Sequence, residues 1–392
     1  MPDPISPDAA SAAVPLLFSP LSLRGVTLRN RIVVSAMCQY SADDGVANDW
    51  HLVNAGKFAQ GGAGLVFLEA TSVLGDGRIT HGDLGLWDDA QIAPLARITA
   101  FLRSQGAAAG IQLGHAGRKS CMSRPWEGNG PLTPELIAGG STPWQTIAPS
   151  AEPIGPGWMT PRAMNDAELE RVRSAFRQAA HRALTAGFDV VEVHAAHGYL
   201  LHSFLSPLSN HRDDHYGGDR DGRMRFPLEI ATILRQVWPQ DKPLFFRCSA
   251  VDNDPAGWAL DDSVVLARRL REIGVDVVDC SSGGIAGSAT AASTAPRGLG
   301  FQVPFADRIR REAGIGTMAV GLILSAAQAQ EILDSGAADL VAIAREALYD
   351  PNWPVHAAQA LGVDPGFALW PKQYGWWLAR REPVLRALGV RG

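Results

Sequence analysis

The stretch GFDVVEVH, residues 187–194, places a glycine before a short apolar run that ends in a polar residue. The same arrangement recurs in GGAGLVFLEAT (61–71), GVDVVDCS (274–281) and GAADLVAIAR (336–345). Each copy follows a segment with helical periodicity, so the chain repeats the order helix, glycine, apolar strand. This order is typical of βα units that build a parallel sheet.

Four further apolar runs complete the set of expected strands. They are RIVVSAM (31–37), AAAGIQLG (107–114), PLFFRCS (243–249) and TMAVGL (317–322). Eight strands with helices between them predict an α/β protein with a closed (β/α)8 TIM barrel, and a doubly wound open sheet is the alternative. The segment FSPLSLRGVTLRNR (18–31) indicates an N-terminal hairpin, which we expect to plug the bottom of the barrel.

Three segments lie outside this repeat. Residues 1–15 are rich in Pro, Ala and Ser, and we expect them to be disordered. Residues 119–164 form a long excursion after strand three, rich in Pro, Gly and Trp, and structured loops of this length commonly act as lids. Residues 370–392 form a tail that contains three tryptophans. We expect residues 16–392 to make one barrel domain, with the excursion as its cap.

The composition is that of a globular protein with ample material for a core, with 46% hydrophobic and 19% charged residues. The net charge is −5 and no run is rich in Lys or Arg, so we expect no binding to nucleic acid or to membrane surfaces. The N-terminus lacks the cationic start of a secretory signal, and no apolar run approaches a membrane span. The four cysteines are scattered without a CxxC pair, which predicts reduced thiols in a cytoplasmic protein.

Polar side chains gather where the expected strands end, which is the edge at which barrel enzymes carry their sites. Glu192 and His194 share one face of their strand, and Arg247 takes an inward position in the next strand. Gln112 lies near the end of strand three, and Arg345 follows the last strand. We expect four of them to lie at one level and to face a polar, charged ligand: Gln112, His194, Arg247 and Arg345. A buried ion pair between Glu192 and Arg247 is the structural alternative.

Two histidines, His194 and His197, stand three residues apart, with Tyr199 just behind them. Zinc is one interpretation, but the HEXXH pattern is absent and the cysteines are not spaced as ligands, so we expect no metal. A purely structural role is a second interpretation. We favour a third, in which two ring nitrogens donate hydrogen bonds to a developing oxyanion and Tyr199 donates a proton.

The segment HAAHGYLLHSFLSPLSNHRDDHYGGDRDGRMRF (194–226) resembles the flavin-oxidoreductase signature of the Old Yellow Enzyme family. Four more motifs resemble the thermophilic-like branch, which contains the bacterial xenobiotic reductases: SAMCQY (35–40), QLGHAGRKS (112–120), AVGLI (319–323) and AIARE (342–346). The resemblance implies an FMN-bound barrel that takes hydride from NADPH or NADH. The implied reaction reduces the activated C=C bond of α,β-unsaturated carbonyl compounds, with nitro compounds as further candidates.

The resemblance also implies an FMN site at the mouth of the barrel. The residues implied along the flavin ring are Ser35, Ala36, Met37, Cys38, Ala70, Gln112 and Arg247. Arg247 would lie at the N1/O2 edge, where a cation stabilises the anionic reduced flavin. The backbone around Gly321, Ala344 and Arg345 would bind the phosphate, as expected for the loops after strands seven and eight of such a barrel.

For the substrate, the resemblance implies that His194 and His197 hold the carbonyl or nitro oxygen above the flavin. Tyr199 resembles the acid that protonates the α-carbon after hydride reaches the β-carbon from flavin N5. Tyr40 resembles a second phenol that contacts the substrate. Cys38 would lie near N5 and modulate the redox potential, and a small buried thiol is its structural alternative.

The tail resembles a segment that crosses a dimer interface in this branch and lines the neighbour's substrate pocket. Trp377 resembles a lid tryptophan, and Trp376 stands where other members have an arginine, so we expect a homodimer or homotetramer whose pocket favours bulky, less polar enones. Packing of both tryptophans on their own barrel is the alternative. Ala36 and Ala344 replace a common Pro and Gly. Arg297 replaces a pocket-shaping Trp of some relatives, which leaves the substrate open.

Two other functions are alternatives on these residues. A non-catalytic flavin-binding protein or sensor would share the cofactor site, and a yellow protein whose flavin is never bleached by NADPH would favour it. FMN demethylases and dienoyl reductases share the fold, but those larger enzymes carry iron–sulfur cysteine clusters that this sequence lacks. The sequence does not choose between NADPH and NADH.

Overall fold

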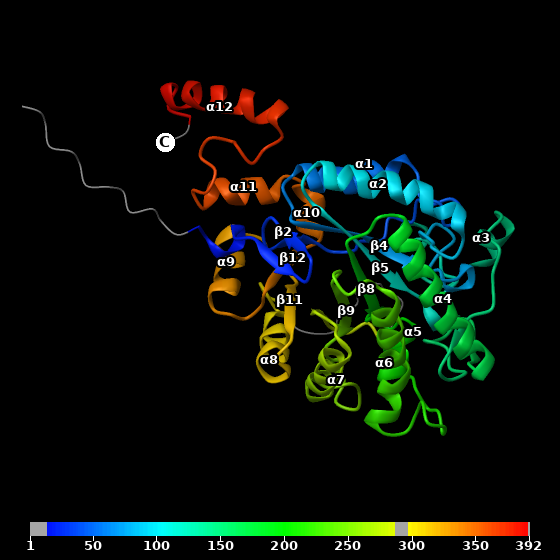
Figure 1. Ribbon diagram of the computed structural model, residues 1–392. Helices are drawn as coiled ribbons and strands as arrows, with labels where there is room; N and C mark the ends of the chain where they lie inside the picture. The colour runs from blue at the N-terminus through cyan, green and yellow to red at the C-terminus, as the bar shows by residue number, and fades with distance from the viewer. Residues whose placement is uncertain (1–13, 287–296, 391–392) are drawn as a thin grey trace, which may run out of the picture.

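The computed structural model describes residues 14–286 and 297–390 of the chain. Except for its last two residues, the segment 1–15 that we expect to be disordered lies outside this part. Eight parallel strands close into a barrel, which confirms the predicted fold and excludes the open sheet (Figure 1). In barrel order the strands are β3 (Ile32–Val34), β4 (Leu65–Ser72), β5 (Ala108–Gly114), β8 (Val190–Ala195), β9 (Leu244–Ser249), β10 (Val277–Ser281), β11 (Gly316–Val320) and β12 (Leu340–Ile343).

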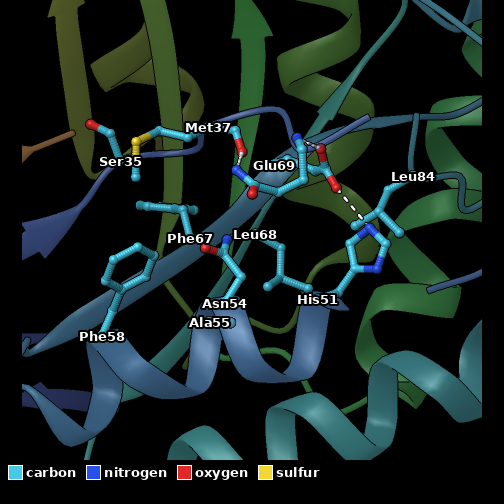
Figure 2. Close-up of a pocket in the computed structure, with 11 residues that line it drawn as sticks. Ser35, Met37, His51, Asn54, Ala55, Phe58, Phe67, Leu68, Glu69 and Leu84 are labelled. Atoms are coloured by element: carbon cyan, nitrogen blue, oxygen red, sulfur yellow. Dashed lines mark hydrogen bonds and ion pairs between the residues drawn. The ribbon is translucent and has the colours of Figure 1, made fainter. Parts of the chain in front are cut away.

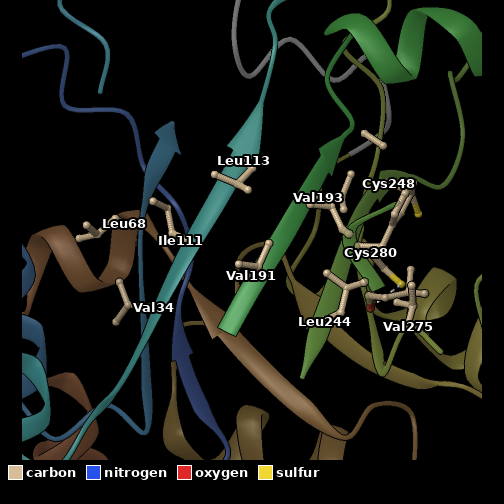
Figure 3. Close-up of a cluster of buried hydrophobic side chains, with 14 of the residues drawn as sticks. Val34, Leu68, Ile111, Leu113, Val191, Val193, Leu244, Cys248, Val275 and Cys280 are labelled. Atoms are coloured by element: carbon tan, nitrogen blue, oxygen red, sulfur yellow. Dashed lines mark hydrogen bonds between the residues drawn. The ribbon is translucent and has the colours of Figure 1, made fainter. Parts of the chain in front are cut away.

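Helices follow the strands along the chain and surround the barrel (Figure 1). The longer ones are α1 (Asp49–Gln60), α2 (Ile92–Ser104), α4 (Asp166–Thr185), α6 (Arg220–Val237), α7 (Leu260–Ile273), α8 (Val303–Ala313), α9 (Ala326–Asp334) and α11 (Trp353–Ala360). Two short helices, α5 (Leu200–Leu205) and α10 (Arg345–Tyr349), begin close to the ends of β8 and β12. The outward side chains of the strands, such as Val191 and Val193, belong to the large core between barrel and helices (Figure 3).

Local sequence signals explain where these elements begin and end. The Asn165 side chain accepts the amide of Glu168, and the Glu168 carboxylate accepts the amide of Asn165, so α4 begins with a reciprocal cap. After α4 the chain turns at Gly187, whose φ of 85° favours glycine. The first predicted strand, 31–37, is shorter than expected because the chain leaves the sheet after Val34 and reaches a left-handed residue, Tyr40, with φ 52°.

The predicted N-terminal hairpin is present as β1 (Leu21–Leu23) and β2 (Val26–Leu28). Leu28 packs in a second apolar cluster with residues from the first halves of the barrel strands, among them Phe67 and Phe245. The hairpin therefore closes the amino-terminal end of the barrel, and the opposite end is left for the site.

The excursion after strand three is structured. It holds a single turn of 3-10 helix (Pro125–Glu127), the short α3 (Pro134–Ala138), and a small ladder of β6 (Ile147–Ala148) with β7 (Arg162–Ala163). Met122 and Trp158 pack in one cluster with Tyr40 and Tyr199, and the ring of Trp126 lies 6.0 Å from that of Tyr40. The excursion thus contacts Tyr40 and Tyr199, the two tyrosines that we expect at the substrate.

The tail forms α12 (Lys372–Ala387), which stands apart from the barrel at the end of the chain (Figure 1). Trp376 and Trp377 are 51% and 66% exposed, so in a single chain neither packs on its own barrel. Within the described residues, no helix is long and apolar enough to cross a membrane.

Candidate active site

The barrel register sets the height of each polar side chain at the mouth. His194 is in register with Arg247, and Arg247 with Asp279, so these three lie at one level on β8, β9 and β10. Gln112 is in register with Glu192, two residues below His194. Arg345 lies beyond β12 in α10, with its side chain exposed. The expectation of a single level is therefore wrong for Gln112 and Arg345, because strand ends alone do not fix the pairing offset.

A buried group of charges lies at and just below this level. Nε of Arg247 is 3.0 Å from Oδ2 of Asp279, and Nε2 of Gln112 donates to Oε1 of Glu192 at 2.7 Å. The alternative of a buried ion pair between Glu192 and Arg247 is therefore wrong, because Arg247 pairs with Asp279. Burial raises the pKa of Glu192, and the neighbouring Asp279 raises it further. Glu192 therefore holds its proton near neutral pH.

The three rings of the proposed clamp come together. The ring centroid of His194 lies 5.2 Å from that of His197 and 4.9 Å from that of Tyr199. Nδ1 of His194 accepts the amide of Ala196 at 3.3 Å, so the proton of its neutral ring is on Nε2. Nε2 of His197 is 2.7 Å from Oγ of Ser281. Because Ser281 occupies Nε2, Nδ1 is the ring nitrogen of His197 that is left for a ligand.

The ionisation of these rings suits hydrogen-bond donation. Burial lowers the pKa of both His194 and His197, and the charge of Arg247 lowers both further. Burial raises the pKa of the Tyr199 phenol. Near neutral pH the site therefore holds two neutral imidazoles, each with one N–H, beside a phenol that keeps its proton.

The buried carboxylate of Glu69 holds the segment that carries Cys38 and Tyr40. A register shift in β4 pairs Ala70, instead of Glu69, with Gln112 of β5. The Glu69 carboxylate accepts a hydrogen bond from the backbone amide of Gln39. Nε2 of His51, from α1, lies 3.0 Å from Oε1 of Glu69 (Figure 2). Burial and the charge of Glu69 raise the pKa of the Cys38 thiol, so it remains a thiol near neutral pH.

Features of the mouth fit a planar, polar ring with an anionic edge. Within the described residues, the buried Oγ of Ser35 has no hydrogen-bond partner. Ala36 and Ala70 are half-buried and carry small side chains, and Arg247 supplies a cation. Gly321 and Ala344 follow the neighbouring strands β11 and β12, and β12 pairs with β3, the strand that Ser35 and Ala36 follow. The side chain of Arg345 is exposed next to Ala344 and belongs to none of the ion pairs between described residues.

Sequence reasoning missed the residues that hold these groups in place. Asp279 and Lys119 are buried side chains, and so is His202, whose Nε2 lies 2.8 Å from Oδ1 of Asp252. Two signals in the sequence could have indicated them. Asp279 is a polar residue inside an expected strand, and Lys119 is the second of two adjacent cations in GRKS. In the part of the chain that the structure describes, no three His, Cys, Asp or Glu side chains are grouped so as to hold a metal ion.

The closed barrel and the polar group at its mouth fit the class of flavin-dependent barrel oxidoreductases. The chain belongs to the NADH:flavin oxidoreductase / NADH oxidase family, which it matches over residues 16–363. It is therefore an NAD(P)H-dependent flavin oxidoreductase with FMN as its cofactor, and the resemblance to the Old Yellow Enzyme family is confirmed.

Individual relatives agree with this assignment. An NADPH dehydrogenase of Geobacillus thermodenitrificans (strain NG80-2) is 47% identical over 350 residues, covering 89% of this chain and 95% of the relative. One from Listeria innocua serovar 6a is 43% identical and covers 91% and 98%. Morphinone reductase in complex with tetrahydroNAD has a TM-score of 0.71, 27% identity and coverage of 89% and 92%. The old yellow enzyme homologue from Zymomonas mobilis has a TM-score of 0.72, 25% identity and coverage of 88% and 93%.

Proposed function

We propose that the protein reduces the activated C=C bond of α,β-unsaturated ketones, aldehydes and maleimides, with nitro compounds as further substrates. The observation that carries this proposal is the group of His194, His197 and Tyr199, two neutral imidazoles and a protonated phenol at the barrel mouth. Such a group can bind an oxygen that gains negative charge and deliver a proton beside it.

The chemistry that bound FMN supplies is the storage of a hydride from NAD(P)H and its release to the β-carbon of the alkene. Nε2–H of His194 and the ring of His197 hold the carbonyl oxygen, which becomes negative as the β-carbon is reduced. The Tyr199 hydroxyl then gives its proton to the α-carbon. Hydride and proton together add two hydrogen atoms across the double bond.

The other mouth residues are assigned from their positions. Ser35, Ala36, Met37, Cys38, Ala70, Gln112 and Arg247 would line the flavin ring, and Gly321, Ala344 and Arg345 would hold its phosphate. The unpartnered Oγ of Ser35 and the cation of Arg247 support the ring contacts. Tyr40, which follows the Gln39 amide that donates to Glu69, would contact the substrate, and Cys38 would tune the cofactor's redox potential.

The segments around the mouth complete the pocket in this proposal. The excursion 119–164 acts as a cap, which its packing on Tyr40 and Tyr199 supports. The tail, residues 370–392, lies at the interface of a homodimer or homotetramer, where Trp376 and Trp377 line the neighbour's substrate pocket. Adjacent indole rings left in water would be costly, and their exposure in a single chain supports a partner that covers them.

Anaerobic titration with NADPH and NADH, followed by a panel of enones, tests the proposal. We expect the yellow flavin to be bleached by the nicotinamide and restored in full by an enone such as 2-cyclohexenone. A flavin that NAD(P)H never bleaches would instead indicate the flavin-binding or sensor alternative. A flavin that is bleached but ignores every alkene would retain the oxidoreductase and exclude ene reduction.

A further inference from the structure

Lys119 is one of the most deeply buried side chains of the protein, with 0% of it exposed. It ends the short 3-10 turn (Gly117–Lys119) that follows β5. Its ammonium donates to the carbonyl oxygen of His197 at 2.9 Å and to that of Gly284 at 2.5 Å. Lys119 therefore ties the loop after β5 to the loops after β8 and β10. A buried ammonium is expensive unless it has such partners, so its position needs an explanation.

His197 has a backbone conformation that residues other than glycine adopt uncommonly. Its φ is 61°, in the left-handed region, which costs about 1 kcal/mol or more for a residue other than glycine. Its amide donates to Oγ of Ser249 at 3.0 Å, and its carbonyl accepts from Lys119. The next amide, that of Gly198, donates to Nδ1 of His202 at 2.8 Å. Three buried side chains thus hold the two peptide groups that flank the His197 side chain.

The loops that Lys119 joins are in direct contact. A Cβ on Gly284 would lie 2.6 Å from Cα of His197, and a Cβ on Gly198 would lie 2.2 Å from the Gly284 carbonyl oxygen. Because the main chains are this close, the Lys119 ammonium reaches both carbonyl oxygens at once. An apolar side chain in place of Lys119 would leave both oxygens buried without this donor.

We propose that Lys119 is a positioning residue for the reaction, which sets the His197 imidazole for the substrate oxygen by holding the His197 carbonyl in its left-handed conformation. This inference rests on the proposed function of His197 as a ligand of the substrate oxygen. Misplacing a reacting group by about 1 Å can reduce a rate by about 10²-fold, so such a hold has a measurable effect.

The test is a double-mutant cycle on the FMN-loaded, full-length protein, with 4-chlorophenol as the probe. The variants are Lys119→Met, His197→Ala and the double variant, and the dissociation constant comes from the change in flavin absorbance. We expect Lys119→Met to weaken phenol binding by about tenfold or more, and to have little further effect once His197 is alanine. FMN content and thermal unfolding show whether each variant is folded.

Lys242→Met is the matched control, because the Lys242 ammonium also caps a main-chain carbonyl, that of Phe188, at the far end of the barrel. It should leave phenol affinity at the wild-type value. Equal, additive losses for Lys119→Met with and without His197 would overturn the inference, as would wild-type phenol affinity in Lys119→Met. These outcomes do not involve an alkene, so they are distinct from failure of ene reduction.

Should Lys119→Met not fold, Ser249→Ala replaces it in the same cycle. Ser249 holds the His197 amide from the opposite side and donates to the Gly283 carbonyl oxygen at 2.7 Å. A loss of phenol affinity that vanishes in the His197→Ala background would again support a positioned His197. An additive loss, or no loss, would show that the conformation of this backbone does not set the imidazole.

Discussion

The ring of Tyr199 stands edge-on to the ring of His194, with an interplanar angle of 87° and centroids 4.9 Å apart. This contact places the proposed proton donor next to the proposed oxyanion ligand in a buried setting that keeps the phenol protonated. An acid and a clamp side by side at one end of a barrel are what alkene reduction requires of the protein. Each group can be removed separately.

Tyr199→Phe should leave reduction of the flavin by NADPH nearly intact and slow reoxidation by enones by about 10²–10⁴-fold, because only the second step needs carbon protonation. Quinones, which accept protons on oxygen, should be less affected. Stopped-flow absorbance separates the two half-reactions. Unchanged enone reoxidation would show that the proton comes from another source.

His194→Ala or His197→Ala should each lower enone turnover by about 10²–10³-fold, because each removes one donor to the developing oxyanion. Small phenols that bind as phenolates should lose affinity in both variants. His181→Ala, on the exposed face of α4, is the control and should behave as the wild type. Unaltered phenol binding in both clamp variants would rule the clamp out.

Glu192→Gln should change how stability depends on pH. Burial raises the folded-state pKa of Glu192 to about 8, above an unfolded value of about 4.3. Between these values the folded protein binds a proton that the unfolded chain releases, so the free energy of unfolding decreases as pH rises through this window. Glutamine mimics the protonated acid and still accepts from Gln112.

Thermal unfolding of the holoprotein between pH 5 and pH 8.5 measures this effect. The wild type should lose more stability over the range than Glu192→Gln does. Glu170→Gln, on the exposed part of α4, should follow the wild type. Parallel pH curves for wild type and Glu192→Gln would mean that Glu192 is already ionised in the folded protein.

Trp377→Ala should alter substrate preference and raise KM for bulky enones, while the FMN content stays the same. The reason is that the proposed lid lies on the neighbouring subunit and does not contact the phosphate site. Steady-state kinetics and light scattering check this together. A monomeric wild-type protein in light scattering would contradict the shared pocket.

The sequence was sufficient for the barrel, because four strands share the glycine-plus-apolar pattern, four more are short apolar runs, and helical segments lie between them. The sequence also indicated that His194, His197 and Tyr199 lie close together, since all three fall within a stretch of six residues at a strand end. The structural alternative, an ion pair between Arg247 and Glu192, was wrong because both Glu192 and Asp279 face inward and only the strand register distinguishes them.

The hold on His197 could not be predicted for a different physical reason. The partners of Lys119 are main-chain carbonyl oxygens 78 and 165 residues away in the sequence. Every residue has such an oxygen, so the residue type does not indicate which one is the partner. The left-handed conformation of His197 is equally invisible, because most residues in that conformation are glycine or asparagine. Only the folded loops bring these groups into contact.

The most direct test of ene reduction is the position of deuterium in the product of 2-methyl-2-cyclohexenone. Turnover with unlabelled NADPH in D2O should place one deuterium on the α-carbon, and turnover with hydride-labelled NADPH in H2O should place one on the β-carbon. This result would show hydride and proton added across the C=C bond. Deuterium on the carbonyl carbon of an alcohol product, or recovery of unreduced enone while NADPH is consumed, would contradict the account.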